Sequence, residues 1–231
     1  MSRITIPARE AAPAASQPLL DAVEQSLGSI PNLFRLIALS PVALEAYLGQ
    51  NGLLAKTLSV KTRERIALAV AQVNGCDYCL SAHTYLGLNL AGLDDEEIAL
   101  NRNGHSNDPK ADAAVSFAAK VARERGRVDN ADVAALRAAG YDDSKIVEIV
   151  ALVAESSFTN FLNNVVQTEV DFPAVSAADL AEVCDRAGNI IIEIVAVAPA
   201  QPRVKVSVRL SPPKTTSCVG RIERLRSDEN H

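Results

Sequence analysis

Helix signals follow one another without a break up to about residue 172, and no segment there alternates with period two for long enough to predict a strand. In "TRERIALAVAQVNG", for example, Ile66, Val70 and Val73 share one helical face, and the closing Asn-Gly pair is typical of a helix end. Alanine is abundant and aromatic residues make up only 4% of the chain. Since alanine has the highest helix propensity and aromatic residues favour strands, the sequence predicts an all-α bundle over residues 1–173.

Several boundaries of these helices can be placed from local signals. Ser29 shortly precedes Pro31 and Ser40 directly precedes Pro41, so each pair predicts a helix start. The helix that opens near "GCDYC" is expected to run on to Gly92. Four later segments predict further helices: "LDDEEIALNR", "DPKADAAVSFAAKVARERG", "DNADVAALRAAG" and "DDSKIVEIVALVAESSFTNFLNNVVQ".

Residues 174–231 differ in character from the rest of the chain. The segment is rich in β-branched residues and proline, and "RVKVSVRL" alternates as an exposed strand would. We therefore predict a C-terminal, non-helical extension, either a short hairpin or a disordered segment. Cys184 and Cys218 lie in it without C-x-x-C spacing, so we expect both to be free thiols.

Charge and hydropathy exclude two classes of partner. With a formal net charge of -5 and a pI near 5.3, the chain has no basic face for a nucleic acid. Its longest apolar runs are far shorter than the ~20 residues that span a bilayer, and the N-terminus lacks the apolar stretch of a secretory signal. We expect a cytoplasmic protein, in which thiols stay reduced unless they take part in chemistry.

The densest group of reactive side chains is in "GCDYCLSAH", which holds Cys76, Cys79 and His83. On a helix these three positions share one face, and the two cysteines are close enough to form a disulfide. A helix that starts at this point would place both sulfurs near its positive end, which favours thiolate. Because His83 is four residues from Cys79 and seven from Cys76, we expect Cys79 to be the nucleophile and Cys76 the resolving thiol.

Two other interpretations of this group are a zinc site and a pair of buried, inert thiols. A zinc site needs four ligands, or three and a water, and the only other histidine of the helical region, His105, lies in a polar loop. If the two thiols were inert, the position of His83 one helical turn after Cys79 would be a coincidence. The spacing therefore favours a redox dithiol, with no metal and no cofactor, since the helical region also lacks a glycine-rich phosphate loop.

Glu64 is a further candidate, twelve residues before Cys76. If the chain turns back at Asn74-Gly75, an antiparallel helix pair brings Glu64 and His83 to a similar height, where a carboxylate would orient the imidazole. Alternatively, Glu64 is simply an acid in the first turn of its helix. The spacing leaves both possibilities open.

At these residues the chain resembles the AhpD-like alkylhydroperoxidase group of the carboxymuconolactone decarboxylase superfamily. The family pattern, a glutamate, a gap and then C-x-x-C-x-x-x-H, reads here as Glu64, Cys76, Cys79 and His83, and the similarity spans about residues 20–173. The resemblance implies an AhpD-like helical fold, assembly into homo-oligomers with active sites near subunit contacts, and cofactor-free peroxidase activity. It also implies that Cys79 is peroxidatic, that Cys76 is resolving, and that Glu64 and His83 form a proton relay.

Some members of this group carry a second histidine just before the nucleophilic cysteine. Here the position is Tyr78, a candidate relay residue whose phenol donates a hydrogen bond but is no base near neutral pH. The expected reaction is reduction of an organic hydroperoxide or hydrogen peroxide, with a lipoyl or thioredoxin-like protein as the external dithiol reductant. The alternatives are a carboxymuconolactone-decarboxylase-like enzyme, which has no need of paired thiols, and a redox-sensing dithiol protein.

Overall fold

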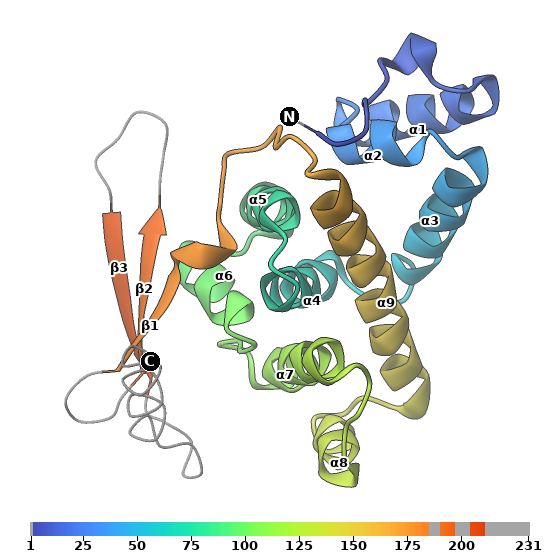
Figure 1. Cartoon of the computed structure of the whole chain (residues 1–231). Coiled ribbons are helices and arrows are strands. Elements are labelled where there is room, and N and C mark those ends of the chain that lie inside the picture. Colours follow the sequence, from blue (N-terminus) through green and yellow to red (C-terminus); the bar gives the residue numbers. More distant parts are fainter. Residues whose placement is uncertain (1, 185–189, 197–203, 211–231) are drawn as a thin grey trace, which may run out of the picture. The chain divides into compact units, whose positions relative to one another are not determined.

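The computed structural model describes residues 2–184, 190–196 and 204–210, and the chain forms two compact units, Met1–Ala177 and Ala178–His231 (Figure 1). The first unit is helical, as predicted. Its α-helices are α1 (Gln17–Leu27), α2 (Asn32–Ile37), α3 (Pro41–Leu54), α4 (Val60–Val73), α5 (Asp77–Leu86), α6 (Asp95–Arg102), α7 (Pro109–Glu124), α8 (Asn130–Ala138) and α9 (Asp143–Val166). Two short 3-10 turns, η1 (Arg9–Ala11) and η2 (Ala14–Ser16), precede them.

Helix α4 lies at the centre of this unit and packs against α5, α6, α7 and α9 (Figure 1). Every residue from Ile66 to Ala71 is buried, so the helix faces protein on all sides. The chain then reverses at Gly75, whose φ of 61° is readily reached by glycine, and α5 begins two residues later. This reversal places the start of α5 beside α4 in the core.

The helix boundaries agree with the local signals in some places and differ in others. Ser40 caps α3 as expected, since its Oγ accepts a hydrogen bond from Ala43 N at 3.3 Å. Helix α2, however, begins at Asn32, and its backbone N–H is capped by Asp171 Oδ2 at 2.7 Å. The capping residue is 139 positions away in the sequence, so Ser29 and Pro31 alone do not predict it.

The helix expected to run from the cysteines to Gly92 does end at Gly92, whose φ is 62°, but its last turn is not α-helical. Helix α5 ends at Leu86, and η3 (Gly87–Ala91), a turn of π-helix, follows it. Gly87 packs closely there, because a Cβ on it would lie 3.3 Å from Leu93 Cδ1. A side chain at this position would require Leu93 to shift slightly, so the π-turn is closely packed against the core.

Helix α9 is long and apolar, and by length and composition alone it would be able to span a membrane. It nevertheless carries a row of buried polar side chains that face the neighbouring helices: Glu155, Ser156, Thr159, Asn160 and Asn163. This pattern is that of a core helix in a helical bundle, with a polar site on one side.

Three strands follow the helical unit, β1 (Leu180–Cys184), β2 (Ile190–Ala196) and β3 (Val204–Leu210), after the short turn η4 (Ala177–Asp179). They pair antiparallel in the order β1-β2-β3. The unit boundary lies after Ala177 instead of residue 173, because the connecting segment is tied to α5: Val175 N donates to Ser81 Oγ at 2.9 Å. Cys218 lies outside the described residues, as does the side chain of Cys184.

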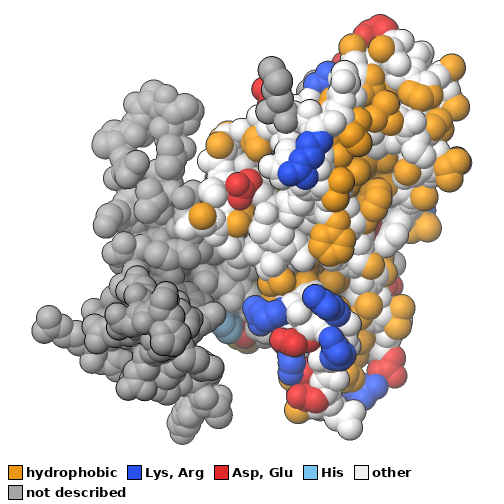
Figure 2. Space-filling view, viewed as in Figure 1, with side chains coloured by type: hydrophobic (Ala, Val, Ile, Leu, Met, Phe, Trp, Pro, Cys, Tyr) orange, Lys and Arg blue, Asp and Glu red, His pale blue; other side chains and the backbone are white. Residues whose placement is uncertain are grey.

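Large apolar side chains are exposed along one side of the helical unit, where Figure 2 shows them gathered over α3 and α9. We call this the α9 apolar face. It is defined by these exposed residues: Val42, Leu53, Val147, Val150, Phe158, Phe161 and Val165.

Candidate active site

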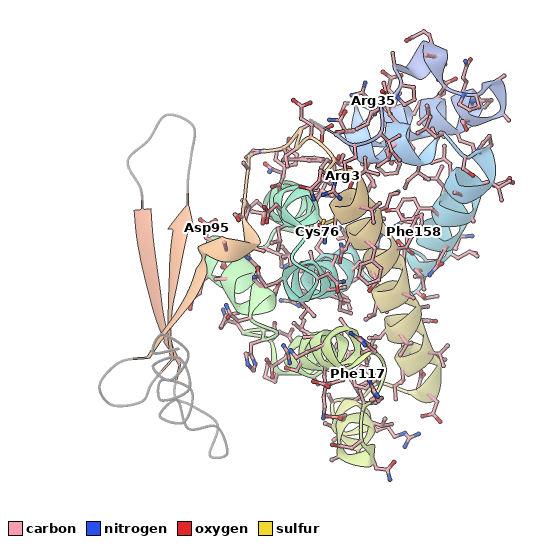
Figure 3. The ribbon with its side chains drawn as sticks, in the orientation of Figure 1. Arg3, Arg35, Cys76, Asp95, Phe117 and Phe158 are labelled. Carbon is pink, nitrogen blue, oxygen red and sulfur yellow. The ribbon has the colours of Figure 1, made fainter. Side chains whose placement is uncertain are left out.

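Cys76 and Cys79 lie together in the core where α4, α5 and α9 meet (Figure 3). Cys76 is the N-cap of α5, and its Sγ accepts a hydrogen bond from Cys79 N at 3.3 Å. The two sulfurs are 2.6 Å apart, which is longer than the ~2.05 Å of a disulfide, and both thiols are free. The start of the helix therefore holds the two sulfur atoms close to each other.

The surroundings of the two thiols separate their acidities. Burial raises the pKa of Cys79, but the hydrogen bond from the Cys76 thiol, the charge of His83 and the carboxamides of α9 lower it to about 7. The pKa of Cys76 moves far upward, chiefly because its thiol donates to Cys79 and secondly because it is buried. These surroundings favour ionisation of Cys79 over that of Cys76.

Glu64 and His83 form a buried pair between α4 and α5. His83 Nδ1 lies 2.7 Å from Glu64 Oε2, and the glutamate side chain is only 8% exposed. Burial lowers the pKa of His83, but the adjacent Glu64 carboxylate outweighs it, so the pKa is raised. Of the two possibilities that the spacing left open for Glu64, this contact matches the one in which the carboxylate orients the imidazole.

Tyr78 is engaged on the other side of α5. Its hydroxyl accepts a hydrogen bond from Leu33 N at 3.1 Å, and its ring packs edge-on against Phe172 with centroids 5.9 Å apart. Burial raises the pKa of Tyr78 well above its ordinary value. In this arrangement the phenol anchors α5 to the start of α2.

Helix α9 contributes two buried carboxamides that the sequence analysis did not identify. Asn163 Nδ2 donates to Cys79 Sγ at 3.3 Å, and Asn160 Oδ1 accepts from Asn74 Nδ2 at 2.9 Å. The Asn160 side chain also lowers the pKa of Cys79, although its Nδ2 forms no hydrogen bond of normal geometry with any described residue. Both asparagines therefore border the nucleophilic sulfur.

A cavity of about 40 Å³ adjoins the Glu64–His83 pair and extends between α3, α4 and α9. Polar side chains line much of it, including Asn51, Arg63 and Glu155. Glu155 Oε1 accepts from Asn51 Nδ2 at 2.7 Å, and burial raises the pKa of this carboxyl. At ~10–15 Å³ per ordered water, the cavity has room for about three water molecules.

One signal in the sequence could have pointed to these residues of α9. Glu155, Thr159 and Asn163 recur every four residues in an otherwise apolar helix, so they form a polar stripe on one face. Such a stripe on a buried helix needs partners, but the sequence does not name them.

The metal interpretation can be compared with how potential ligands are arranged in the described part of the chain. No group of three or more His, Cys, Asp or Glu side chains there is arranged to hold a metal ion. His105 instead lies in an exposed position with its Nδ1 3.2 Å from Asp112 Oδ1.

Comparison with known proteins places the helical unit in a recognisable group. Residues 41–124, which include Glu64 and the C-x-x-C-x-x-x-H segment, match the model of the carboxymuconolactone decarboxylase family. A search of curated proteins finds no significant match.

Two similar solved structures are described as peroxidase-related. One, an uncharacterized protein from Ralstonia eutropha JMP134 with an alkylhydroperoxidase AhpD core, is 25% identical, with a TM-score of 0.65 over 74% of this chain and 92% of that one. The other, from Silicibacter sp. TM1040, is also 25% identical, with a TM-score of 0.64 over 73% of this chain and 91% of that one. The debrominase Bmp8, in complex with 2,3,4-tribromopyrrole, shares the fold at 20% identity, with a TM-score of 0.62 over 74% of this chain and 94% of that one.

Proposed function

Since the helical unit of this chain is an AhpD-like member of the carboxymuconolactone decarboxylase superfamily, we propose that it is a thiol peroxidase. Its substrate is an organic hydroperoxide or hydrogen peroxide, and the chemistry needs no bound cofactor. The observation that carries the proposal is the position of two thiols, with their sulfur atoms 2.6 Å apart, on the same helix as a histidine that is held by a buried glutamate.

In the first half of the proposed reaction, Cys79 attacks the peroxide. His83, oriented by Glu64, takes the proton of the Cys79 thiol. The thiolate attacks the terminal oxygen of ROOH, the S–O bond forms, and the O–O bond breaks. The electron pair leaves with RO⁻, which recovers the proton from His83, so that the products are ROH and the sulfenic acid of Cys79.

In the second half, the Cys76 thiol condenses with the sulfenic acid, giving the Cys76–Cys79 disulfide and water. The high pKa of Cys76 keeps its proton in place until this step, in which the proton leaves with the departing oxygen. An external dithiol, from a lipoyl or thioredoxin-like protein, then reduces the disulfide. Such reductants belong to a reducing compartment, so we propose a cytoplasmic location.

The proposal is tested by turnover with dihydrolipoamide as the reductant and cumene hydroperoxide or hydrogen peroxide as the oxidant. Cys79→Ser should abolish consumption of peroxide, and Cys76→Ser should permit one oxidation of Cys79 but no turnover. Cys184→Ser removes a thiol outside the motif and serves as the control. Wild-type consumption no faster than that of Cys79→Ser would rule out the peroxidase.

Two alternatives make different predictions in the same experiment. A lactone decarboxylase would act on its substrate equally well after both cysteines are replaced. The lowered pKa of Cys79 favours the peroxidase over this alternative, because a lactone decarboxylase has no need of a reactive thiol. A redox sensor would form the disulfide once and change its assembly state without turnover. Following substrate, disulfide and oligomeric state together separates the three.

We further propose that the protein assembles as a homo-oligomer through the α9 apolar face. Monomeric soluble proteins seldom expose large contiguous apolar patches. This face continues from the aromatic cluster in which Tyr47 contacts both Phe34 and Phe158, with ring centroids 5.9 and 6.2 Å apart. Tyr47 also lines the cavity at His83, so this aromatic residue connects the face with the cavity.

A further inference from the structure

Two polar atoms beside the dithiol form no hydrogen bond of normal geometry with any described residue. These are Nδ2 of Asn160, a donor, and Oδ1 of Asn163, an acceptor. Both side chains are buried, at 0% and 3% exposure, so bulk water does not compensate for the missing bonds. Buried polar atoms are paired almost everywhere in native proteins, so two unpaired ones next to a reactive sulfur point to a missing ligand.

Each asparagine is held in place through its other polar atom. Asn160 Oδ1 accepts from Asn74 Nδ2 at 2.9 Å, and Asn163 Nδ2 donates to Cys79 Sγ at 3.3 Å. Neither carboxamide is therefore free to turn its unpaired atom away without losing an existing bond. The result is one fixed donor and one fixed acceptor on the same side of α9, both bordering Cys79.

A hydroperoxide carries the complementary groups. Its terminal O–H is a donor, and its second oxygen is an acceptor that becomes negatively charged as the O–O bond breaks. We propose that Asn160 and Asn163 form the peroxide-binding subsite: Asn163 Oδ1 accepts the terminal O–H, and Asn160 Nδ2 donates to the departing oxygen.

This inference rests on the proposed peroxidase function and adds a positioning role for α9. In the step that it concerns, the Cys79 sulfur bonds to the terminal oxygen, the O–O bond breaks, and the electron pair moves to RO⁻. The N–H group of Asn160 stabilises that charge until His83 returns the proton. A donor of this kind acts more strongly in the transition state than in the bound substrate, so it raises the rate of the chemical step.

The test compares two reactions of the same sulfur in a Cys76→Ser background, so that only Cys79 reacts. Reaction with cumene hydroperoxide expels an oxygen anion, whereas alkylation by iodoacetamide expels iodide and has no use for an N–H donor. Rate constants are measured against pH by mass spectrometry, and each is expressed per thiolate. For Asn160→Ala we expect the peroxide rate to fall about 10–100-fold, with the alkylation rate per thiolate almost unchanged.

A second variant protects the test against loss of folding. Asn160→Asp keeps the oxygen that accepts from Asn74 and removes the donor, while its added carboxylate charge acts on the thiolate in both reactions. Because each rate is expressed per thiolate, the same selective loss of the peroxide reaction should remain. The matched control is Asn164→Ala, which removes a carboxamide four residues after Asn160 on α9, where Nδ2 donates to Asn74 O. Its peroxide and alkylation rates should both stay near those of the parent.

The possible outcomes separate this inference from the proposed function. If the parent reacts rapidly with peroxide and both Asn160 variants do so equally, the subsite is wrong and the peroxidase stands. Equal loss of both reactions would mean that Asn160 acts only on the thiolate, which also overturns the subsite. A parent that reacts with peroxide no faster than a free thiol would remove the proposed function and the subsite with it.

Discussion

At the scale of single residues, the site depends on how two chemically identical thiols become different. The Cys76 thiol donates a hydrogen bond to Cys79, and Asn163 donates a second one. The positive charge of His83 further lowers the pKa of Cys79. The spacing of the motif predicted the members of this group, because Cys76, Cys79 and His83 lie within two turns of one helix. The contribution of Asn163, 84 residues away, depends on tertiary packing and was not predictable from spacing.

The acidity of Cys79 gives a prediction in pH. With a pKa of about 7, its alkylation by iodoacetamide should be half-maximal near pH 7 and should rise as the thiol deprotonates. Glu64 raises the pKa of His83, so Glu64→Gln should leave the imidazole less protonated and move the midpoint for Cys79 to higher pH. Mass spectrometry of Cys79 after timed labelling gives the profile.

Glu148→Gln is the control for this experiment, because Glu148 pairs with Lys145 on the surface of α9 at 2.7 Å and lies outside the cavity beside His83. Its midpoint should equal that of the wild type. A wild-type midpoint near 9, the ordinary value of a free thiol, would contradict the assigned thiolate.

At the scale of elements, local chemistry predicted most helices of the first unit and missed what depends on distant contacts. The start of α3 at Ser40 and the end of α4 at Asn74 follow from residues next to each boundary. By contrast, α2 is capped by Asp171, and the polar stripe of α9 finds its partners on other helices. Neither feature can be derived from one helix by itself.

The N-cap of α5 can be tested apart from its redox role. Cys76→Ser and Cys76→Ala both remove the thiol, but only serine supplies an oxygen that can accept from Cys79 N. We therefore expect the alanine variant to have a free energy of unfolding about 1 kcal/mol lower than the serine variant. Urea denaturation followed by circular dichroism measures the difference, and equal stabilities would show that the cap contributes nothing.

A buried ion pair holds α6 against α4. Arg65 Nε lies 2.7 Å from Glu97 Oε1, with the side chains only 13% and 6% exposed. Glu97→Ala leaves the arginine buried without its partner, so we expect a loss of about 3 kcal/mol in the free energy of unfolding. The exposed Glu96→Ala on the same helix should change stability little.

The same pair predicts how stability depends on pH. Burial raises the pKa of Glu97, but hydrogen bonds from Ser106 and Asn107 and the charge of Arg65 lower it overall. Because the folded pKa lies below the unfolded value, this stabilisation is complete above the unfolded pKa and is lost as the pH falls through the folded one. Glu97→Ala should therefore weaken the acid dependence of unfolding, and an unchanged dependence would contradict this role.

At the scale of the whole molecule, the described strands differ from the helical unit in class as well as position in the chain. The composition changes near residue 174, whereas the first unit extends to Ala177 and its last residues hydrogen-bond to α5. The composition of a segment shows where the types of residue change along the chain. It does not show which backbone N–H groups form hydrogen bonds with a neighbouring helix.

The proposed assembly yields a prediction at this scale. Phe161 is 57% exposed at the centre of the α9 apolar face, so Phe161→Glu should place a charge in the interface and shift the protein toward smaller species. Sedimentation velocity at several concentrations measures this shift. Leu27→Glu, an exposed apolar position on α1, is the control, and identical behaviour of the two variants would argue against this interface.

The position of Cys76 at the first turn of α5 has a wider consequence. One sulfur atom both secures the Cys79 amide and supplies the electrons of the proposed disulfide. In each catalytic cycle, the hydrogen bond between the Cys79 amide and the Cys76 sulfur would therefore weaken on oxidation and re-form on reduction. We therefore expect the rate of hydrogen exchange at the Cys79 amide to differ between the dithiol and the disulfide, so that this rate reports the oxidation state of the protein.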